Sequence, residues 1–299
     1  MTMKTKISHR FEFILFWCLT QIMRLFSARM ADRLAVILGK AAYHVLTSRR
    51  RIALDNLRRA FKDEKTEAEY RKIAKTVFVN MARSIVEFIR MPLLSKEKIM
   101  EIVPEHIGTE HLDDALRKGR GGLVVSAHFG NWELLGARIA AAGYPSDFLV
   151  GRQHNQYVDN ALLKIRAVTG AGIISVGVGS RHVLKSLRDN RLVILAADQH
   201  SATGAVITRF FGRPAATHKG PAAFAIKMNC PLIFGCLIRE RYDRFRLITE
   251  APLYSPGSRD PEKDIQTMMQ AYSEWLEKII RQYPEQWMWT HRRWKVDSR

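Results

Sequence analysis

The stretch HFGNWE, residues 128–133, places a histidine and a glutamate five positions apart, directly after the apolar run GGLVVSA. Histidine is the side chain best suited to take up a proton near neutral pH, and a carboxylate bonded to its far nitrogen fixes the tautomer and stabilises the imidazolium. We therefore predict that His128 is a general base and that Glu133 orients it. Gly130 would permit the chain reversal between them, and Asn131 would cap the helix that follows.

This spacing has a second interpretation, in which no chemistry takes place. A histidine after a strand is often a packed core residue, and a glutamate in the first turn of a helix often only offsets the helix dipole. Taken alone, the spacing fits this interpretation more often than catalysis. The residues themselves leave both interpretations open.

Further polar residues follow other apolar runs, at positions where strands are expected to end. Arg152 follows DFLVG, and Asp198 and Gln199 follow RLVILAA. In open α/β sheets the reactive site lies outside the carboxyl ends of the strands, so parallel neighbours would bring these residues into one crevice with His128. We predict that Arg152, Asp198, Gln199 and Asn131 bind substrate, although Asp198 and Gln199 are also candidates for structural caps of their loop.

Several common chemistries lack their motifs. The histidine and glutamate do not form H-E-x-x-H, and Ser126 does not lie in a G-x-S-x-G turn, so a zinc hydrolase and a serine hydrolase have no support. The three cysteines have no metal-ligand spacing and an odd number, and we assign them neither a metal nor a disulfide. A reducing cytoplasm is therefore expected for the soluble part.

The elements that must position these residues are read from hydrophobic periodicity. Short apolar runs predict strands over 121–128, 146–152, 172–177, 191–198, 231–240 and 244–253. Helical patterns occur over 131–142, 157–169, 180–189, 219–228 and 262–283. Strands that alternate with helices predict an α/β fold with a central, mostly parallel or mixed sheet flanked by helices. We expect this catalytic domain to cover residues 104–299.

The N-terminal third has a different composition. Apolar stripes at helical spacing predict a helical region over 47–103. Residues 1–60 contain 12 Lys or Arg and 3 Asp or Glu, within a chain of net charge +19. Basic residues beside the aromatic run FEFILFW indicate an anionic membrane surface, so residues 1–46 are predicted to form a membrane-anchoring helical segment. The apolar run 11–23 is short for a span, which favours an interfacial helix over a transmembrane helix or an ordinary core helix.

The whole chain resembles a known family. HFGNWE resembles the motif of glycerolipid-type acyltransferases, and RIALDNLRRAF, the stretch over 196–232 and YPEQWMWTHRRW agree in order with the lipid A late acyltransferases. The resemblance implies an O-acyltransferase that moves a fatty acyl chain to a hydroxyl group of a lipid A precursor. His128 would deprotonate that hydroxyl, Glu133 would support His128, and the acyl group would pass directly, without a metal.

The resemblance also implies partners and a location. The acyl donor would be a thioester of acyl carrier protein or coenzyme A, used as a co-substrate with no other cofactor. The acceptor would be a phosphorylated glycolipid, and the enzyme would work at the cytoplasmic face of the bacterial inner membrane. Arg152 would bind an anionic headgroup or stabilise the oxyanion. The basic stretch HRRWK (291–295) would contact headgroups, the carrier or only solvent.

Other functions stay open at this point. The acceptor could be a different glycolipid, such as a mannosylated phosphatidylinositol, because the residues between His128 and Glu133 do not identify it. A basic nucleic-acid-binding protein is a second class, although no nucleic-acid module occurs in the sequence and we expect no nucleic-acid partner. A membrane protein without catalytic activity is a third.

Overall fold

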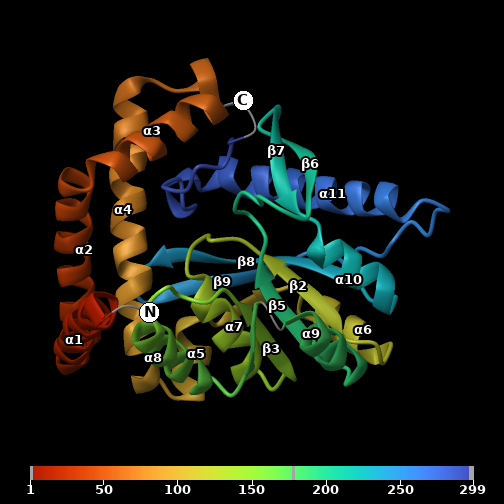
Figure 1. The fold of residues 1–299 in the computed structure, drawn as a ribbon, viewed down its shortest axis with the longest axis horizontal. Coiled ribbons are helices and arrows are strands. Elements are labelled where there is room, and N and C mark those ends of the chain that lie inside the picture. Colours follow the sequence, from red (N-terminus) through yellow and green to blue (C-terminus); the bar gives the residue numbers. More distant parts are fainter. Residues whose placement is uncertain (1–2, 177–178, 296–299) are drawn as a thin grey trace.

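The computed structural model describes residues 3–176 and 179–295, and its centre is a seven-stranded sheet (Figure 1). The strands are β1 (Glu105–Ile107), β2 (Gly122–Ser126), β3 (Ser146–Val150), β4 (Gly172–Ser175), β5 (Leu192–Ala196), β8 (Leu232–Arg241) and β9 (Arg244–Thr249), with spatial order β1-β9-β8-β2-β5-β3-β4. Five neighbours, from β8 to β4, run parallel, whereas β9 is antiparallel to β8 and β1 is parallel to β9. The predicted α/β fold with a mixed, mostly parallel sheet is confirmed.

All six strands predicted from hydropathy are present; five are shorter than their apolar runs, and β8 has the predicted length but is shifted by one residue. Residue 177, at the end of the strand predicted over 172–177, lies outside the described residues. The helices of this part are α5 (Lys96–Ile102), α6 (Thr109–Arg117), α7 (Trp132–Ala141), α8 (Gln156–Ala167), α9 (Gly179–Arg188), α10 (Gly220–Met228) and α11 (Pro261–Gln282). The five helices predicted between residues 131 and 283 correspond to α7 to α11.

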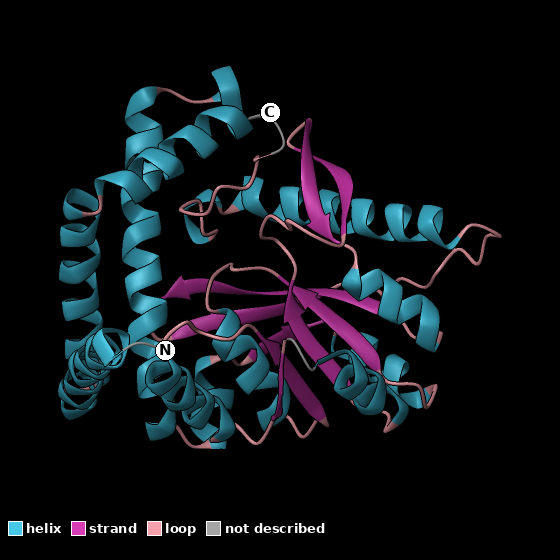
Figure 2. Cartoon of the chain, in the orientation of Figure 1, coloured by secondary structure: helices cyan, strands magenta, loops and turns pink. Residues whose placement is uncertain are grey.

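The central strands are continuous apolar runs because both faces of the sheet are covered by helices (Figure 2). Side chains alternate between the faces. Leu123 and Val125 of β2 belong to a core shared with α9, α10 and α11, whereas Val124 belongs to a second core shared with α5, α6, α7 and α8.

The N-terminal region is helical, as predicted. It consists of α1 (Met3–Leu25), α2 (Ala28–Val45), α3 (Thr47–Phe61) and α4 (Glu67–Arg90). Thr66 and Glu69 form a reciprocal capping box that starts α4. Gly39 lets α2 lie directly on α4: a Cβ at this position would be 2.6 Å from the Val79 Cα.

Helices α3 and α4 pack against the α/β part of the chain. One core contains residues of both helices and of β2. It includes Leu57 and Phe61 of α3, Val77 of α4, Trp289, and Leu123 and Val125 of β2. The division at residues 46 and 103 stays a prediction from composition.

Four of the described elements, β1, α6, β6 (Ala205–Phe210) and β7 (Arg213–His218), were not expected from the sequence. Strand β1 and helix α6 lie in the stretch before β2. Strands β6 and β7 form an antiparallel hairpin outside the main sheet. In Figure 1 this hairpin stands above the sheet, in front of α11.

No helix among residues 3–176 and 179–295 is long and apolar enough to span a bilayer. The exposed apolar side chains are concentrated near the N-terminal end of the chain. Of the 22 large hydrophobic side chains that are exposed in the described part of the chain, 14 lie between Ile7 and Leu46, on α1, α2 and the residues that follow each of them.

Candidate active site

His128 lies in a tight turn between β2 and α7. The turn needs a left-handed residue, which Gly130 supplies with φ of +56°. A Cβ at Gly130 would lie 1.8 Å from the Leu237 carbonyl oxygen, so this position accepts only glycine. Asn131 then caps α7, because its side chain accepts a hydrogen bond from the Leu134 N–H at 3.0 Å. The predicted reversal and helix cap are therefore both present.

The carboxylate that binds His128 is Asp198, which follows β5. The His128 Nδ1 and the Asp198 Oδ1 are 2.8 Å apart. Strands β2 and β5 are adjacent and parallel, with Ser126 opposite Ala196, so the residues two positions beyond each meet at one edge of the sheet. The Asp198 side chain is only 2% exposed, and its other oxygen accepts a hydrogen bond from the Trp287 indole N–H at 2.9 Å.

Asp198 and His128 each stabilise the charged form of the other. Burial alone would raise the pKa of the Asp198 carboxyl group, but the positive charge of protonated His128 and the hydrogen bonds to the carboxylate lower it to about 2. Burial alone would lower the pKa of His128, yet the charge of Asp198 and the hydrogen bond raise it above its usual 6.5. With Asp198 ionised and accepting from Nδ1–H, the Nε2 atom of neutral His128 carries the free lone pair.

Glu133 does not take the position that the sequence predicted. Its two oxygens accept hydrogen bonds from Arg166 at 2.5 and 2.9 Å, and the two side chains are 12% and 11% exposed. Arg166 lies in the last turn of α8, and its guanidinium matches both carboxylate oxygens at once, which one imidazole N–H cannot do. The predicted bond from Glu133 to His128 is therefore corrected: Asp198 makes it, and Glu133 contributes only its charge, which also raises the pKa of His128.

Asn131 is fully buried, and the prediction that it binds substrate is corrected as well. Its carboxamide oxygen caps α7, and its nitrogen donates to Glu87 of α4 at 2.7 Å. Glu87 also accepts from the buried Arg239 of β8. Asn131 thus joins the turn to a buried ionic cluster, because the cap geometry directs its side chain into the protein.

Gln199 and Arg152 both lie in loops that follow strands of the sheet. The Gln199 Nε2 lies 3.5 Å from the His128 Nε2. Arg152 is exposed in the loop that follows β3, and no contact of its side chain brings it to His128. Strand β3 is the neighbour of β5, so its loop lies on the same edge of the sheet, as predicted.

Sequence reasoning missed the segment 286–294, which completes the site. The Met288 N–H donates to the His128 carbonyl oxygen at 3.0 Å, and the Gly130 N–H donates to the Gln286 carbonyl oxygen at 2.9 Å. Trp287 binds Asp198, as described above. The closing Trp-rich motif was visible in the sequence, but nothing in it indicated which carboxylate its indole would reach.

A buried cation lies close to the pair. Arg293 is 2% exposed and donates to the Ala216 carbonyl oxygen and the Thr217 hydroxyl, both at 2.5 Å. Burial lowers its pKa to about 10, and the negative charge of Asp198 opposes that shift. Among residues 3–176 and 179–295, no group of three or more His, Cys, Asp or Glu side chains is placed to hold a metal ion.

The chain is similar in sequence to known acyltransferases. A lipid A biosynthesis lauroyltransferase of Escherichia coli (strain K12) is 28% identical over 268 residues, which are 88% of this chain and 85% of that protein. A lipid A biosynthesis palmitoleoyltransferase of the same strain is 24% identical over 262 residues, 87% of this chain and 83% of the relative.

A phosphatidylinositol mannoside acyltransferase of Mycobacterium tuberculosis (strain ATCC 25618 / H37Rv) is 25% identical over 217 residues, or 71% of this chain. The match spans 66% of the length of that relative. The family model described as bacterial lipid A biosynthesis acyltransferase matches residues 1–296. The chain therefore belongs to the bacterial lipid A biosynthesis acyltransferase family.

Proposed function

We propose that this protein transfers a fatty acyl group from a thioester to a hydroxyl group of a glycolipid, with His128 as the general base. The observation that carries the proposal is the bond between His128 and the buried carboxylate of Asp198, at the carboxyl ends of two parallel strands. This arrangement raises the basicity of His128, whose side chain is 24% exposed.

The reaction follows from the free lone pair on the His128 Nε2. The acceptor hydroxyl gives its proton to this atom while its oxygen attacks the thioester carbonyl carbon. A C–O bond forms, the tetrahedral intermediate collapses, and the C–S bond breaks. The imidazolium, stabilised by Asp198, returns its proton to the departing thiolate. The Gln199 carboxamide, 3.5 Å from Nε2, is positioned to donate a hydrogen bond to the acceptor or to the developing oxyanion.

In this proposal Glu133 has an indirect role. Its ion pair with Arg166 ties the first turn of α7 to α8 and thereby holds the turn that carries His128. Its negative charge adds to that of Asp198 in stabilising protonated His128. Glu133 is thus a positioning residue, whereas His128 contacts the reacting atoms.

We further propose that the protein acts on the cytoplasmic face of the bacterial inner membrane, held there by α1 and α2. The exposed apolar side chains on these helices, among them Phe11 and Trp17, would enter the interfacial region of the bilayer. The basic residues of 1–60 would face the anionic headgroups.

The acceptor we propose is a lipid A precursor, and the donor is an acyl carrier protein thioester. The lipid A lauroyltransferase shares a longer stretch and higher identity with this chain than the mycobacterial relative does, which favours the glucosamine-based acceptor. The net charge of +19 would attract an acidic carrier protein, and Arg152, exposed at the site edge, is placed to meet an anionic substrate.

The experiment is acyl transfer by the purified, detergent-solubilised protein with labelled acyl carrier protein and coenzyme A thioesters. The acceptors are a phosphorylated glucosamine lipid, a phosphatidylinositol mannoside and a glycerol phospholipid. We expect transfer to the glucosamine lipid, and loss of transfer in a His128→Ala variant that keeps its melting temperature. Transfer only to the inositol or glycerol lipid would reject the proposed acceptor. Full activity in the variant would reject the proposed base.

A further inference from the structure

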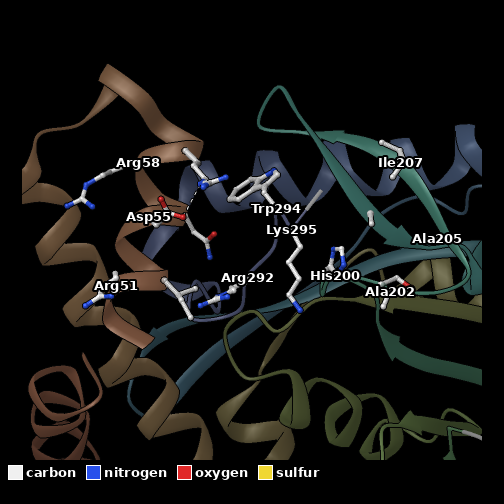
Figure 3. Close-up of a pocket in the computed structure, with 15 residues that line it drawn as sticks. Arg51, Asp55, Arg58, His200, Ala202, Ala205, Ile207, Arg292, Trp294 and Lys295 are labelled. Atoms are coloured by element: carbon white, nitrogen blue, oxygen red, sulfur yellow. Dashed lines mark hydrogen bonds and ion pairs between the residues drawn. The ribbon is translucent and has the colours of Figure 1, made fainter. Parts of the chain in front are cut away.

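A groove of about 960 Å³ lies beside the proposed active site, between α3 and the β6–β7 hairpin (Figure 3). Five cationic side chains line it, namely Arg51, Arg58, Arg59, Arg292 and Lys295, together with one carboxylate, Asp55. The α3 residues share one side of their helix because positions 51, 55, 58 and 59 follow the helical repeat. The groove is therefore a concave, strongly positive surface.

Part of this charge is not neutralised by the residues that the structure describes. Arg58 pairs with Glu67, and Arg59 pairs with Asp55. Arg51, Arg292 and Lys295 have no ion pair with any other residue that the structure describes. Like charges that converge without counter-charges repel one another, and an anion bound between them removes that repulsion.

The groove and the proposed base, His128, are connected through the loop that follows β5. His200 lines the groove two residues after Asp198, and the backbone N–H of His200 donates to the His291 Nε2 at 3.1 Å. Asn56 of α3 donates to the His291 carbonyl oxygen at 2.7 Å. In Figure 3 Arg292 and Lys295 lie between α3 and His200, and Lys295 extends toward the loop that carries His200. A phosphate bound in the groove would thus belong to a headgroup whose hydroxyl group lies at His128.

The groove also borders the exposed apolar face. Val45 and Leu46, at the end of α2, are 73% and 49% exposed, and α3 starts at the next residue with its run Arg49–Arg51. The phosphate of a membrane lipid lies at this boundary between hydrocarbon and water. A lipid-borne phosphate would therefore meet the groove without leaving the interface.

From these observations we infer that the groove binds the phosphorylated headgroup of the lipid acceptor, with Arg292, Lys295 and Arg51 as its anion ligands. The inference rests on the proposed function, since it assigns a subsite to the same reaction. It holds for either glycolipid class among the relatives, because the subsite recognises the phosphoryl group rather than the sugar.

The test removes two of the cations. The Arg292→Gln/Lys295→Gln variant is compared with Arg120→Gln/Arg188→Gln, which loses the same charge. Arg120 precedes β2 and Arg188 ends α9, so both lie at the amino ends of the strands, on the opposite edge of the sheet. Acyl transfer is measured against the concentration of a phosphorylated glucosamine lipid and of the same lipid without phosphate, at saturating thioester.

We expect the groove variant to raise the KM for the phosphorylated lipid on the order of 10- to 100-fold, as for the loss of charge-assisted hydrogen bonds. Its kcat, its KM for the thioester and its use of the phosphate-free lipid should stay near those of the control variant. An equal loss with both lipids, or a rise only in the KM for the thioester, overturns the inference.

A binding measurement separates this inference from the proposed function. Each charge variant is combined with His128→Ala, and binding of both lipids in detergent micelles is followed by tryptophan fluorescence. Weaker binding of the phosphorylated lipid alone supports the groove even if the wild-type protein transfers no acyl group, in which case only the proposed function fails. Unchanged binding of both lipids refutes the groove directly.

Discussion

Asp198→Asn is the substitution that tests the proposed mechanism most directly. Asp198 accepts one hydrogen bond from the His128 imidazole and one from the Trp287 indole. Asparagine has one acceptor oxygen for these two donors. If its oxygen faces Trp287, its NH2 group faces the His128 Nδ1, which must then be the acceptor. The imidazole proton consequently moves to Nε2, where the base is needed.

The cost can be estimated from this loss of the correct tautomer and of the buried charge. We expect kcat to fall about 10²- to 10⁴-fold, equivalent to about 3–5 kcal/mol of transition-state stabilisation. The KM for the acceptor should change little, because Asp198 is 2% exposed and does not face the groove. Since the charge of Asp198 raises the pKa of His128, the residual activity should also extend to lower pH than in the wild type.

The assay is acyl transfer with a labelled thioester, recorded as a pH profile of kcat/KM for both proteins. The melting temperature of each variant shows whether the fold is retained. A conservative control is Asp198→Glu, which keeps the charge and should keep more activity than the asparagine variant. The reasoning is refuted if Asp198→Asn, still folded, retains activity within about threefold of the wild type.

Four further outcomes follow from the same contacts. Glu133→Gln should destabilise the protein by about 3 kcal/mol, because it leaves the Arg166 charge buried without a partner; adding Arg166→Met should restore most of the melting temperature. Trp287→Phe, which removes only a hydrogen bond to a buried carboxylate, should lower kcat on the order of tenfold; unchanged kinetics would show that this bond is dispensable. Gly130→Ala should abolish soluble expression or lower the melting temperature strongly, since its Cβ meets the Leu237 carbonyl oxygen. In the wild type, kcat/KM should fall as the pH drops through the raised pKa of His128, because the protonated imidazole cannot accept a proton; a flat acid profile would contradict this.

The fold was largely predictable because the central strands are buried on both faces and therefore appear as uninterrupted apolar runs. The hairpin β6–β7 was missed, since its strands carry the exposed side chains of Arg209, Pro214 and His218 and have no such run. Strand β1 has only three residues, which is too short for any periodicity. The order of the strands, with β5 inserted between β2 and β3, depends on tertiary packing and has no local signal.

The sequence identified the residues of the candidate site better than it identified the contacts between them. His128, Asp198 and Gln199 were identified because all three follow apolar runs. The partner of His128 was assigned to the nearest acidic residue along the chain, Glu133, whereas the structure uses Asp198, 70 positions away. From the sequence, either Glu133 or Asp198 could bind the imidazole of His128. Glu133 instead pairs with Arg166 of α8, and this contact has no signal in the local sequence.

The contribution of residues 286–294 to the site also fixes the order in which the protein becomes active during its synthesis. The strands β2 and β5, which lead into His128 and Asp198, are synthesised well before this segment. Until the indole of Trp287 emerges, the carboxylate lacks one of its donors and the turn around Gly130 lacks its brace. A nascent chain that lacks this segment therefore does not yet have the complete surroundings of His128 and Asp198, although both residues have already been synthesised.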